Sequence, residues 1–99
     1  MLKRKAQVFK ALGHPSRLAM VESLLEGEKC VCELQELVGS DMSTVSKHLA
    51  CLKDCGLVSS RPEGRASVFS LTHPEALNDL FAAAEQLLAL TGDAVALFM

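Results

Sequence analysis

The sequence predicts a mainly α-helical protein with one β-hairpin, arranged as a winged helix-turn-helix in a single domain over residues 1–99. Two observations support this prediction. Apolar residues recur at helical spacing in four segments before Gly56 and again after Pro74, and polarity nearly alternates on both sides of Pro62-Glu63-Gly64. A chain of 99 residues buries one hydrophobic core, so a single domain is expected.

The first two helices are delimited by glycine and proline. A helical pattern covers Lys3 to Leu12 and ends at Gly13. Pro15 is tolerated in the first turn of the second helix, which continues until Gly27. The apolar positions of this second helix are Leu18, Val21, Leu24 and Leu25.

The next two helices form the predicted helix-turn-helix. A short pattern from Glu28 to Val38 is followed by a brief turn and then by a helix over about 42–55. Asp41 is placed to cap this second helix, and Gly56 is placed to end it. The apolar stripe that should pack inward consists of Val45, Leu49 and Leu52.

The opposite side of the helix over 42–55 carries short polar side chains, one lysine and an alanine. Such a face allows a helix to enter a DNA major groove and to reach phosphates and base edges. The alternative interpretation is a solvated amphipathic helix, because most polar faces only meet water. On the DNA-binding interpretation, the predicted contacts of this recognition helix are Ser43, Thr44, Ser46, Lys47 and His48.

The β-hairpin, or wing, is predicted over about 57–71. Arg61 and Arg65 flank its tip, where guanidinium groups can lie against phosphates or enter a minor groove. The alternative is two solvated charges beside a turn. We therefore add both arginines to the predicted DNA contacts.

The terminal helix, predicted over about 75–91, has an apolar face too broad for a small winged domain to cover. Its apolar positions are Leu77, Leu80, Phe81, Ala84, Leu87 and Leu88. An uncovered face of this kind indicates an interface. We expect a homodimer formed through the N-terminal and C-terminal helices, to which Val8 and Leu12 also contribute.

The distribution of charge agrees with a double-stranded DNA partner, although the formal net charge is −2. All ten Lys and Arg residues lie between Lys3 and Arg65, and every Asp, Glu, Lys or Arg after Arg65 is acidic. A dimer doubles the basic face that meets the phosphates.

Other classes of function find little support in the sequence. No apolar run is long enough to cross a bilayer and the N-terminus lacks the apolar core of a signal peptide, so we expect a cytoplasmic protein without a membrane partner. There is no glycine-rich phosphate loop or paired-carboxylate motif, and the chain is too short to enclose a substrate pocket beside its core. An enzyme and a small-molecule substrate are therefore not expected.

Four segments together carry a family resemblance: FKALGHPSRLAMVESLLEGE, CVCELQ, STVSKHLACLKDCGLV and the RPEGR of the wing. In this order they resemble the ArsR/SmtB family of bacterial metal-sensing repressors, over nearly the whole chain. The resemblance implies a homodimeric transcriptional repressor that needs no cofactor to bind its operator. It also implies that the repressor leaves the DNA when an inducer binds.

Cys30 and Cys32 are the primary candidates for holding the inducer. Thiolates select soft ions, and the resemblance to the arsenic-sensing branch implies trivalent arsenic or antimony. That branch has a third cysteine where this chain has Gln35. Residues two apart diverge on a regular helix, so both sulfurs reach one ion only at a helix start or after distortion. The alternative is two small, partly buried apolar side chains.

Cys51 and Cys55 are the secondary candidates, because residues four apart stack on one side of a helix. Their placement resembles a cadmium- and lead-sensing branch of the family, although the C-terminal tail lacks the further cysteine of that branch. One of them could instead supply the missing third thiolate, or both could pack as core residues. A thiol-based redox or persulfide sensor remains a further alternative.

Overall fold

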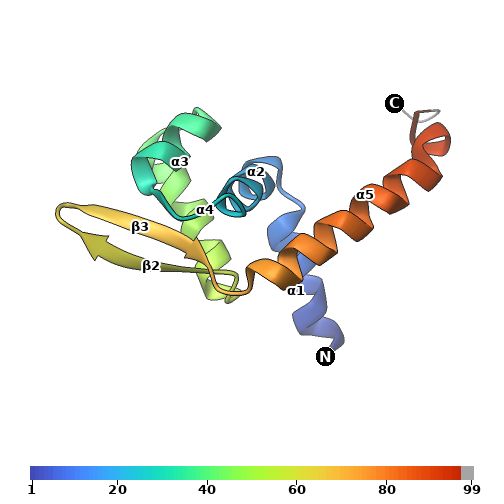
Figure 1. The fold of residues 1–99 in the computed structure, drawn as a ribbon, viewed down its shortest axis with the longest axis horizontal. Helices are drawn as coiled ribbons and strands as arrows, with labels where there is room; N and C mark the ends of the chain where they lie inside the picture. Colours follow the sequence, from blue (N-terminus) through green and yellow to red (C-terminus); the bar gives the residue numbers. More distant parts are fainter. Residues whose placement is uncertain (97–99) are drawn as a thin grey trace.

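The computed structural model describes residues 1–96, with side chains described through Gly92. It has five helices and three short strands (Figure 1). In chain order they are α1 (Leu2–Leu12), α2 (Pro15–Leu24), β1 (Lys29–Cys30), α3 (Val31–Val38), α4 (Met42–Asp54), β2 (Val58–Glu63), β3 (Ala66–Leu71) and α5 (Pro74–Ala96). The mainly helical winged helix-turn-helix expected from the sequence is therefore confirmed. No helix within residues 1–96 is long and apolar enough to cross a bilayer.

The recognition helix α4 is held in place by an apolar stripe and by both of its ends. Val45 and Leu52 are fully buried, and Leu49 is almost so. At the N-terminus, Oδ1 of Asp41 accepts a 2.7 Å hydrogen bond from the backbone N–H of Thr44. After the helix, Gly56 adopts a left-handed conformation with φ of 76°. The inward stripe, the cap and the stop are all as the sequence predicts.

The hydrophobic core lies between the helices and the inner end of the sheet. Met20 from α2 and Leu34 from α3 are fully buried against the stripe of α4, and Phe69 reaches them from the wing. This packing fixes the orientation of α4 relative to the wing, so both predicted DNA-contacting elements belong to one packed unit.

The strand β1 is a feature that the sequence did not predict. The helix expected from Glu28 begins only at Val31, and Lys29–Cys30 is extended and pairs with β3. The sheet order is therefore β1-β3-β2, with all pairs antiparallel. Two residues are too few to show the period-two pattern that identifies a strand. The consequence is a wing that is joined directly to the start of α3.

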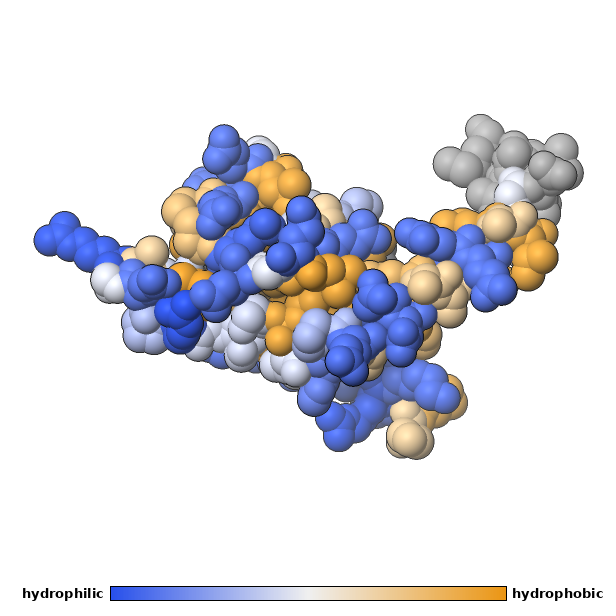
Figure 2. All heavy atoms as spheres, viewed as in Figure 1, coloured by the Kyte–Doolittle hydropathy of each residue, from blue (hydrophilic) through white to orange (hydrophobic). Residues whose placement is uncertain are grey.

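Helix α5 is longer than the predicted 75–91 and extends away from the rest of the molecule, at the end opposite the wing (Figure 1). Leu87 and Leu88 are about three-fifths exposed there, and hydrophobic residues are visible along α5 in Figure 2. On α1, Phe9 is also exposed, whereas Val8 and Leu12 pack against the core. We call the apolar side chains of Phe9, Leu80, Phe81, Ala84, Leu87 and Leu88 the α1–α5 surface.

Replacing Gly56 with alanine is expected to lower the free energy of unfolding by about 1–2 kcal/mol, because an L-residue pays that amount in the left-handed region. No atom lies within 4 Å of the position that the new Cβ would take, so the loss comes from the backbone alone. Gly56→Asn should lose less, since asparagine tolerates this conformation better. Urea unfolding at one fixed protein concentration measures both, and equal losses would contradict a backbone origin.

Candidate DNA-binding surface and thiol sites

The outward face of α4 presents the short polar side chains that the sequence predicts. Ser43, Ser46 and Lys47 are exposed, and Thr44 is half-buried beside the capping Asp41. The hydrogen bond from Thr44 lowers the pKa of the Asp41 carboxyl, so the cap stays ionised near neutral pH. Ser46 borders the groove between α4 and the wing, and the buried stripe anchors the helix from behind.

His48 lies apart from that face, against the junction of α1 and α2. Its ring centroid is 4.4 Å from that of His14, and its Nδ1 is 3.3 Å from Nη1 of Arg17. Burial, together with the charges of His14 and Arg17, lowers the pKa of His48. A neutral, half-buried imidazole in this place orients α4 on α2. Its side chain does not lie on the outward face that carries Ser43 and Lys47.

Arg17 was missed by the sequence reasoning. Its guanidinium donates to the backbone carbonyl oxygens of Ala11 at 2.7 Å and Lys10 at 3.1 Å, and so closes the C-terminal end of α1. Together with its contact to His48, these bonds connect α1, α2 and α4. No spacing or composition signal marks this role, because the partners are carbonyl oxygens and a residue 31 positions away.

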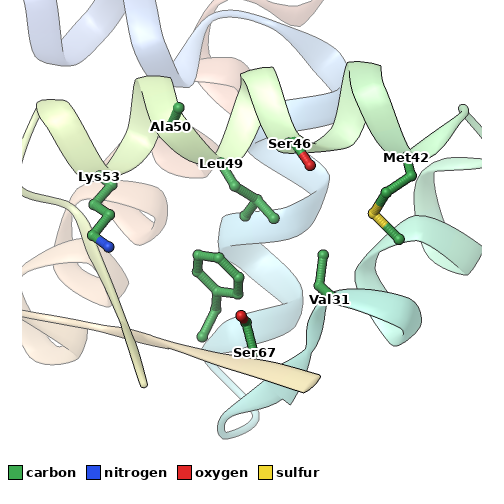
Figure 3. Close-up of a pocket in the computed structure, with 8 residues that line it drawn as sticks. Val31, Met42, Ser46, Leu49, Ala50, Lys53 and Ser67 are labelled. Atoms are coloured by element: carbon green, nitrogen blue, oxygen red, sulfur yellow. The ribbon is translucent and has the colours of Figure 1, made fainter. Parts of the chain in front are cut away.

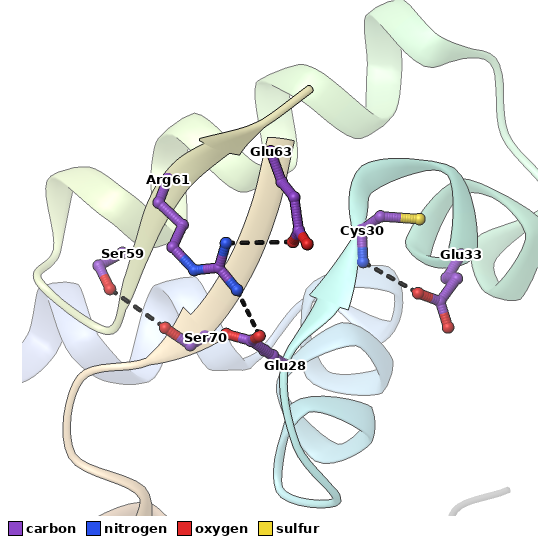
Figure 4. A network of polar contacts seen from close by, with 7 residues as sticks. All are labelled: Glu28, Cys30, Glu33, Ser59, Arg61, Glu63 and Ser70. Carbon is purple, nitrogen blue, oxygen red and sulfur yellow. Dashed lines mark hydrogen bonds and ion pairs between the residues drawn. The ribbon is translucent and has the colours of Figure 1, made fainter. Parts of the chain in front are cut away.

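The wing turns at Gly64 and Arg65, where Gly64 has φ of 62°. Arg65 is exposed in the turn itself and forms no ion pair among the side chains described through residue 92. Arg61, on β2, lies between Glu28 and Glu63, and its Nη1 is 3.1 Å from Oε2 of Glu63 (Figure 4). The hydrogen bonds that Arg61 donates to these carboxylates, to Glu28 above all, raise the pKa of Arg61. The two predicted wing contacts therefore differ, since only Arg65 is uncompensated.

An open groove separates α4 from the wing (Figure 3). It is lined by Val31, Met42, Ser46, Leu49, Ala50, Lys53, Ser67 and Phe69. At one end, Nζ of Lys53 donates a 2.9 Å hydrogen bond to Oγ of Ser60, which bridges the last turn of α4 to β2. This bridge links the recognition helix to the wing at that end of the groove.

Cys30 and Cys32 occupy the start of α3, where two sulfurs can converge. Cys30 is the N-cap residue with extended φ and ψ of −77° and 160°, and its backbone N–H donates to Oε1 of Glu33 at 3.0 Å. Cys32 is exposed in the first turn. A hydrogen bond with the Cys32 side chain raises the pKa of the Cys30 thiol, while the backbone N–H of Glu33 acts to lower it. Cys30 therefore lies just outside the regular helix, at the kind of helix start where two sulfurs can reach one ion.

Cys51 and Cys55 form a second pair, half-buried and packed against the core. Sγ of Cys55 lies 4.0 Å from the backbone oxygen of Gln7 on α1. Burial, and then the neighbouring Cys51 and Asp54, raise the pKa of Cys55. The thiol form is therefore favoured here.

The structure does not bring the two cysteine pairs together. Within residues 1–96, no three His, Cys, Asp or Glu side chains are close enough to one another to hold a metal ion. Neither Cys51 nor Cys55 therefore completes a trithiolate with the other pair inside one chain. Gln35, at the position of the missing third cysteine, instead donates from its side chain to the backbone oxygen of Ser40, at 3.4 Å.

Cys55 is expected to react with iodoacetamide several-fold more slowly than Cys32 in the reduced, folded protein near neutral pH. The thiolate is the reacting species, and both burial and a raised pKa reduce its amount at Cys55. Time-resolved mass spectrometry of the labelled peptides measures the two rates. The rates should converge in urea, and equal rates in the folded protein would place Cys55 in a more open environment than the structure shows.

Comparison with known proteins decides the family. Residues 14–60, from the cap of α2 to β2, match the family described as bacterial regulatory protein, arsR family. The HTH-type transcriptional regulator Rv0081 of Mycobacterium tuberculosis is 37% identical over 90 residues, which cover 90% of this chain and 78% of that protein. The chain belongs to the ArsR family. Members of the ArsR family are DNA-binding transcriptional regulators, so the expectation of a regulator rather than an enzyme is confirmed.

Solved structures of ArsR-family relatives share the whole fold. The crystal structure of Rv0081 has a TM-score of 0.82 with this chain, at 35% identity and with 95% of each chain covered. A homodimeric winged helix-turn-helix domain from Mycobacterium bovis, described as a possible ArsR-family regulator, has a TM-score of 0.76 at 33% identity, with 92% of this chain and 82% of that chain covered.

Two further relatives are named for soft ions. A probable mercury resistance operon repressor of Streptomyces lividans is 41% identical over 69 residues, which cover 70% of this chain and 55% of that protein. An arsenical resistance operon repressor of Staphylococcus xylosus is 35% identical over 71 residues, which cover 72% of this chain and 68% of that protein.

Proposed function

We propose that this ArsR-family protein is a cytoplasmic, dimeric repressor that leaves its operator when arsenite or antimonite binds to Cys30 and Cys32. The observation that supports this proposal most strongly is the position of the two thiols at the N-terminus of α3, the helix that precedes the recognition helix. A soft ion held there acts on the element that braces α4. Two relatives of this chain are named as repressors of mercury and arsenical resistance operons, which supports a soft ion as the inducer.

The DNA contacts are assigned to two elements. Ser43, Thr44, Ser46 and Lys47 of α4 would meet the major groove, because they share its outward face. Arg65, at the tip of the wing, would meet a phosphate or the minor groove, and Arg61 would join it once freed from its carboxylate partners. His48 is given the role of orienting α4, since it is turned toward His14 and Arg17.

The second subunit would pack on the α1–α5 surface. This surface leaves large apolar side chains in water, and a two-fold axis allows the same patch on both subunits to cover itself. The relative from M. bovis, which has the same fold, is homodimeric. A dimer places two recognition helices on one side, as an inverted-repeat operator requires.

Two thiols give a balanced reaction with arsenite. Each of Cys30 and Cys32 replaces one hydroxide of As(OH)₃, so two As–S bonds form, two molecules of water leave, and arsenic stays trivalent. With Gln35 in place of a third cysteine, one hydroxide remains on arsenic. A second candidate site, for cadmium or lead, is the pair Cys51 and Cys55 at the C-terminal end of α4. The raised pKa of Cys55 opposes formation of the thiolate there.

Lys47→Ala is expected to weaken operator binding and to reduce the slope of log K against log salt concentration by about one unit per subunit, since one phosphate contact is lost. Lys3→Ala, on exposed α1, removes the same charge away from the recognition helix and is the matched control. Fluorescence anisotropy of a labelled inverted-repeat duplex, with reduced protein and a salt series, measures both slopes. If the wild type binds no duplex at low salt, the proposed function is wrong.

A further inference from the structure

The wing sheet carries a polar network around Arg61, and Cys30 lies near it at the start of α3 (Figure 4). The guanidinium of Arg61 is paired with Glu28 through Nη2 and with Glu63 through Nη1. Glu28 comes from the segment just before β1, whereas Arg61 and Glu63 belong to β2. The network therefore links the segment before β1 to β2, across the intervening strand β3.

The strand register places Arg61 and Cys30 in one row of this sheet. Val68 of β3 is paired with Arg61 on one side and with Cys30 on the other. Residues directly opposite each other in an antiparallel sheet point to the same face, and so do residues two apart on one strand. Glu28, two residues before Cys30, continues the same face toward Arg61. The carboxylate that holds Arg61 is thus attached to the strand that carries the first thiol.

We propose that Glu28 competes with operator phosphates for Arg61 and links the thiol pair to the wing, a regulatory role that rests on the proposed function. Arg61, Arg65, Glu28 and Glu63 together carry two positive and two negative charges, so this part of the wing has no net charge to attract DNA. Arg61 becomes a phosphate ligand only when its carboxylate partners release it. A phosphate offers the same planar, bidentate match to a guanidinium as a carboxylate.

The exchange is feasible because the ion pair is open to water. The side chains of Arg61 and Glu28 are 51% and 50% exposed, and an exposed ion pair is only marginally stable. An ion shared by Cys30 and Cys32 ties β1 to the first turn of α3. Glu28 then has less freedom to move away from Arg61, and the DNA-bound arrangement of the wing is disfavoured.

Glu28→Gln tests this competition, with Glu26→Gln as the matched control. Glu26 lies two residues earlier, is exposed, and forms no ion pair among the side chains described through residue 92. Both variants remove one negative charge from nearly the same place. Glu28→Gln is expected to tighten operator binding by a factor of about 1.5–5 for each wing, the range of an exposed ion pair, and to reduce the loss of affinity caused by arsenite.

The same change in an Arg61→Gln background should give no such gain, because Arg61, the group for which Glu28 and the phosphates compete, is absent. Equal affinities for Glu28→Gln and Glu26→Gln would overturn the competition. A tighter Glu28→Gln variant with an unchanged arsenite effect would overturn the link to the thiol pair.

A measurement without DNA separates this inference from the proposed function. The Arg61 Nε–H resonance in ¹⁵N–¹H NMR spectra of the free protein is expected to shift in Glu28→Gln, and to shift in the wild type when arsenite is added. If the wild type fails to bind duplex but both shifts occur, the proposed function is wrong and the link between thiols and wing stands. If neither shift occurs, the link is wrong whatever the DNA result.

Discussion

The double variant Cys30→Ser, Cys32→Ser is expected to bind operator DNA like the wild type and to stay bound when arsenite is added. Serine is nearly the same size as cysteine, and the hydrogen bond from the Cys30 backbone to Glu33 does not need the sulfur, so the fold of the α3 start is retained. A hydroxyl is a poor ligand for a soft ion. The wild type should lose about 5- to 150-fold in operator affinity, the usual range of an allosteric coupling.

Cys51→Ser, Cys55→Ser is the matched control, because it also removes two thiols. It should release DNA with arsenite as the wild type does, since the two pairs are separate within the chain. Anisotropy titrations of all three proteins with arsenite, antimonite, cadmium and lead, under anaerobic reducing conditions, compare the sites. If the Cys51, Cys55 variant alone fails to respond to every ion, the sensor lies on the recognition helix and the assignment to Cys30 and Cys32 is wrong.

Leu88→Glu is expected to raise the dissociation constant of the dimer by at least about 100-fold. Burial of one leucine side chain contributes about 1.5–3 kcal/mol. In a two-fold symmetric dimer the substitution is present in both subunits, so this contribution is lost twice. Binding of an inverted-repeat duplex should fall with the dimer, because a monomer engages only one half-site. Sedimentation velocity over a range of concentrations measures the association.

Leu90→Glu provides a control on the same helix. Leu90 is even more exposed than Leu88, but it is two residues away, which places it on the other side of α5 from Leu77, Phe81 and Ala84. The same substitution there should leave the dimer intact. If both variants remain dimeric, the second subunit does not pack on the α1–α5 surface.

Local signals in the sequence were sufficient for three of the helices, α1, α2 and α4. Glycine after a helical pattern, proline in a first turn and an aspartate cap are short-range features, and α1, α2 and α4 begin and end close to the predicted residues. The buried stripe of Val45, Leu49 and Leu52 follows from periodicity alone. The outward face of α4 was predictable for the same reason.

Features that depend on distant partners were not predictable. The pairing of Arg61 with Glu28 joins residues 33 positions apart, and the contact of His48 with Arg17 joins residues 31 apart. Neither leaves a periodic trace in the sequence. Strand β1 exists because β3 offers it a partner, and its two residues show no pattern of their own. The sequence therefore indicated the thiol pair but not its attachment to the wing.

The shape of the three-stranded sheet also determines how copies of this protein can meet. A sheet with an unpaired outer strand is a template for further strands and hence for aggregation. Here one outer strand, β1, has only two residues before the chain turns into α3, and the other, β2, carries Pro62, which has no N–H to donate, between Arg61 and Glu63. One edge strand is too short and the other too charged to pair with a strand of another molecule. This geometry favours the proposed association through the helices over pairing between wings.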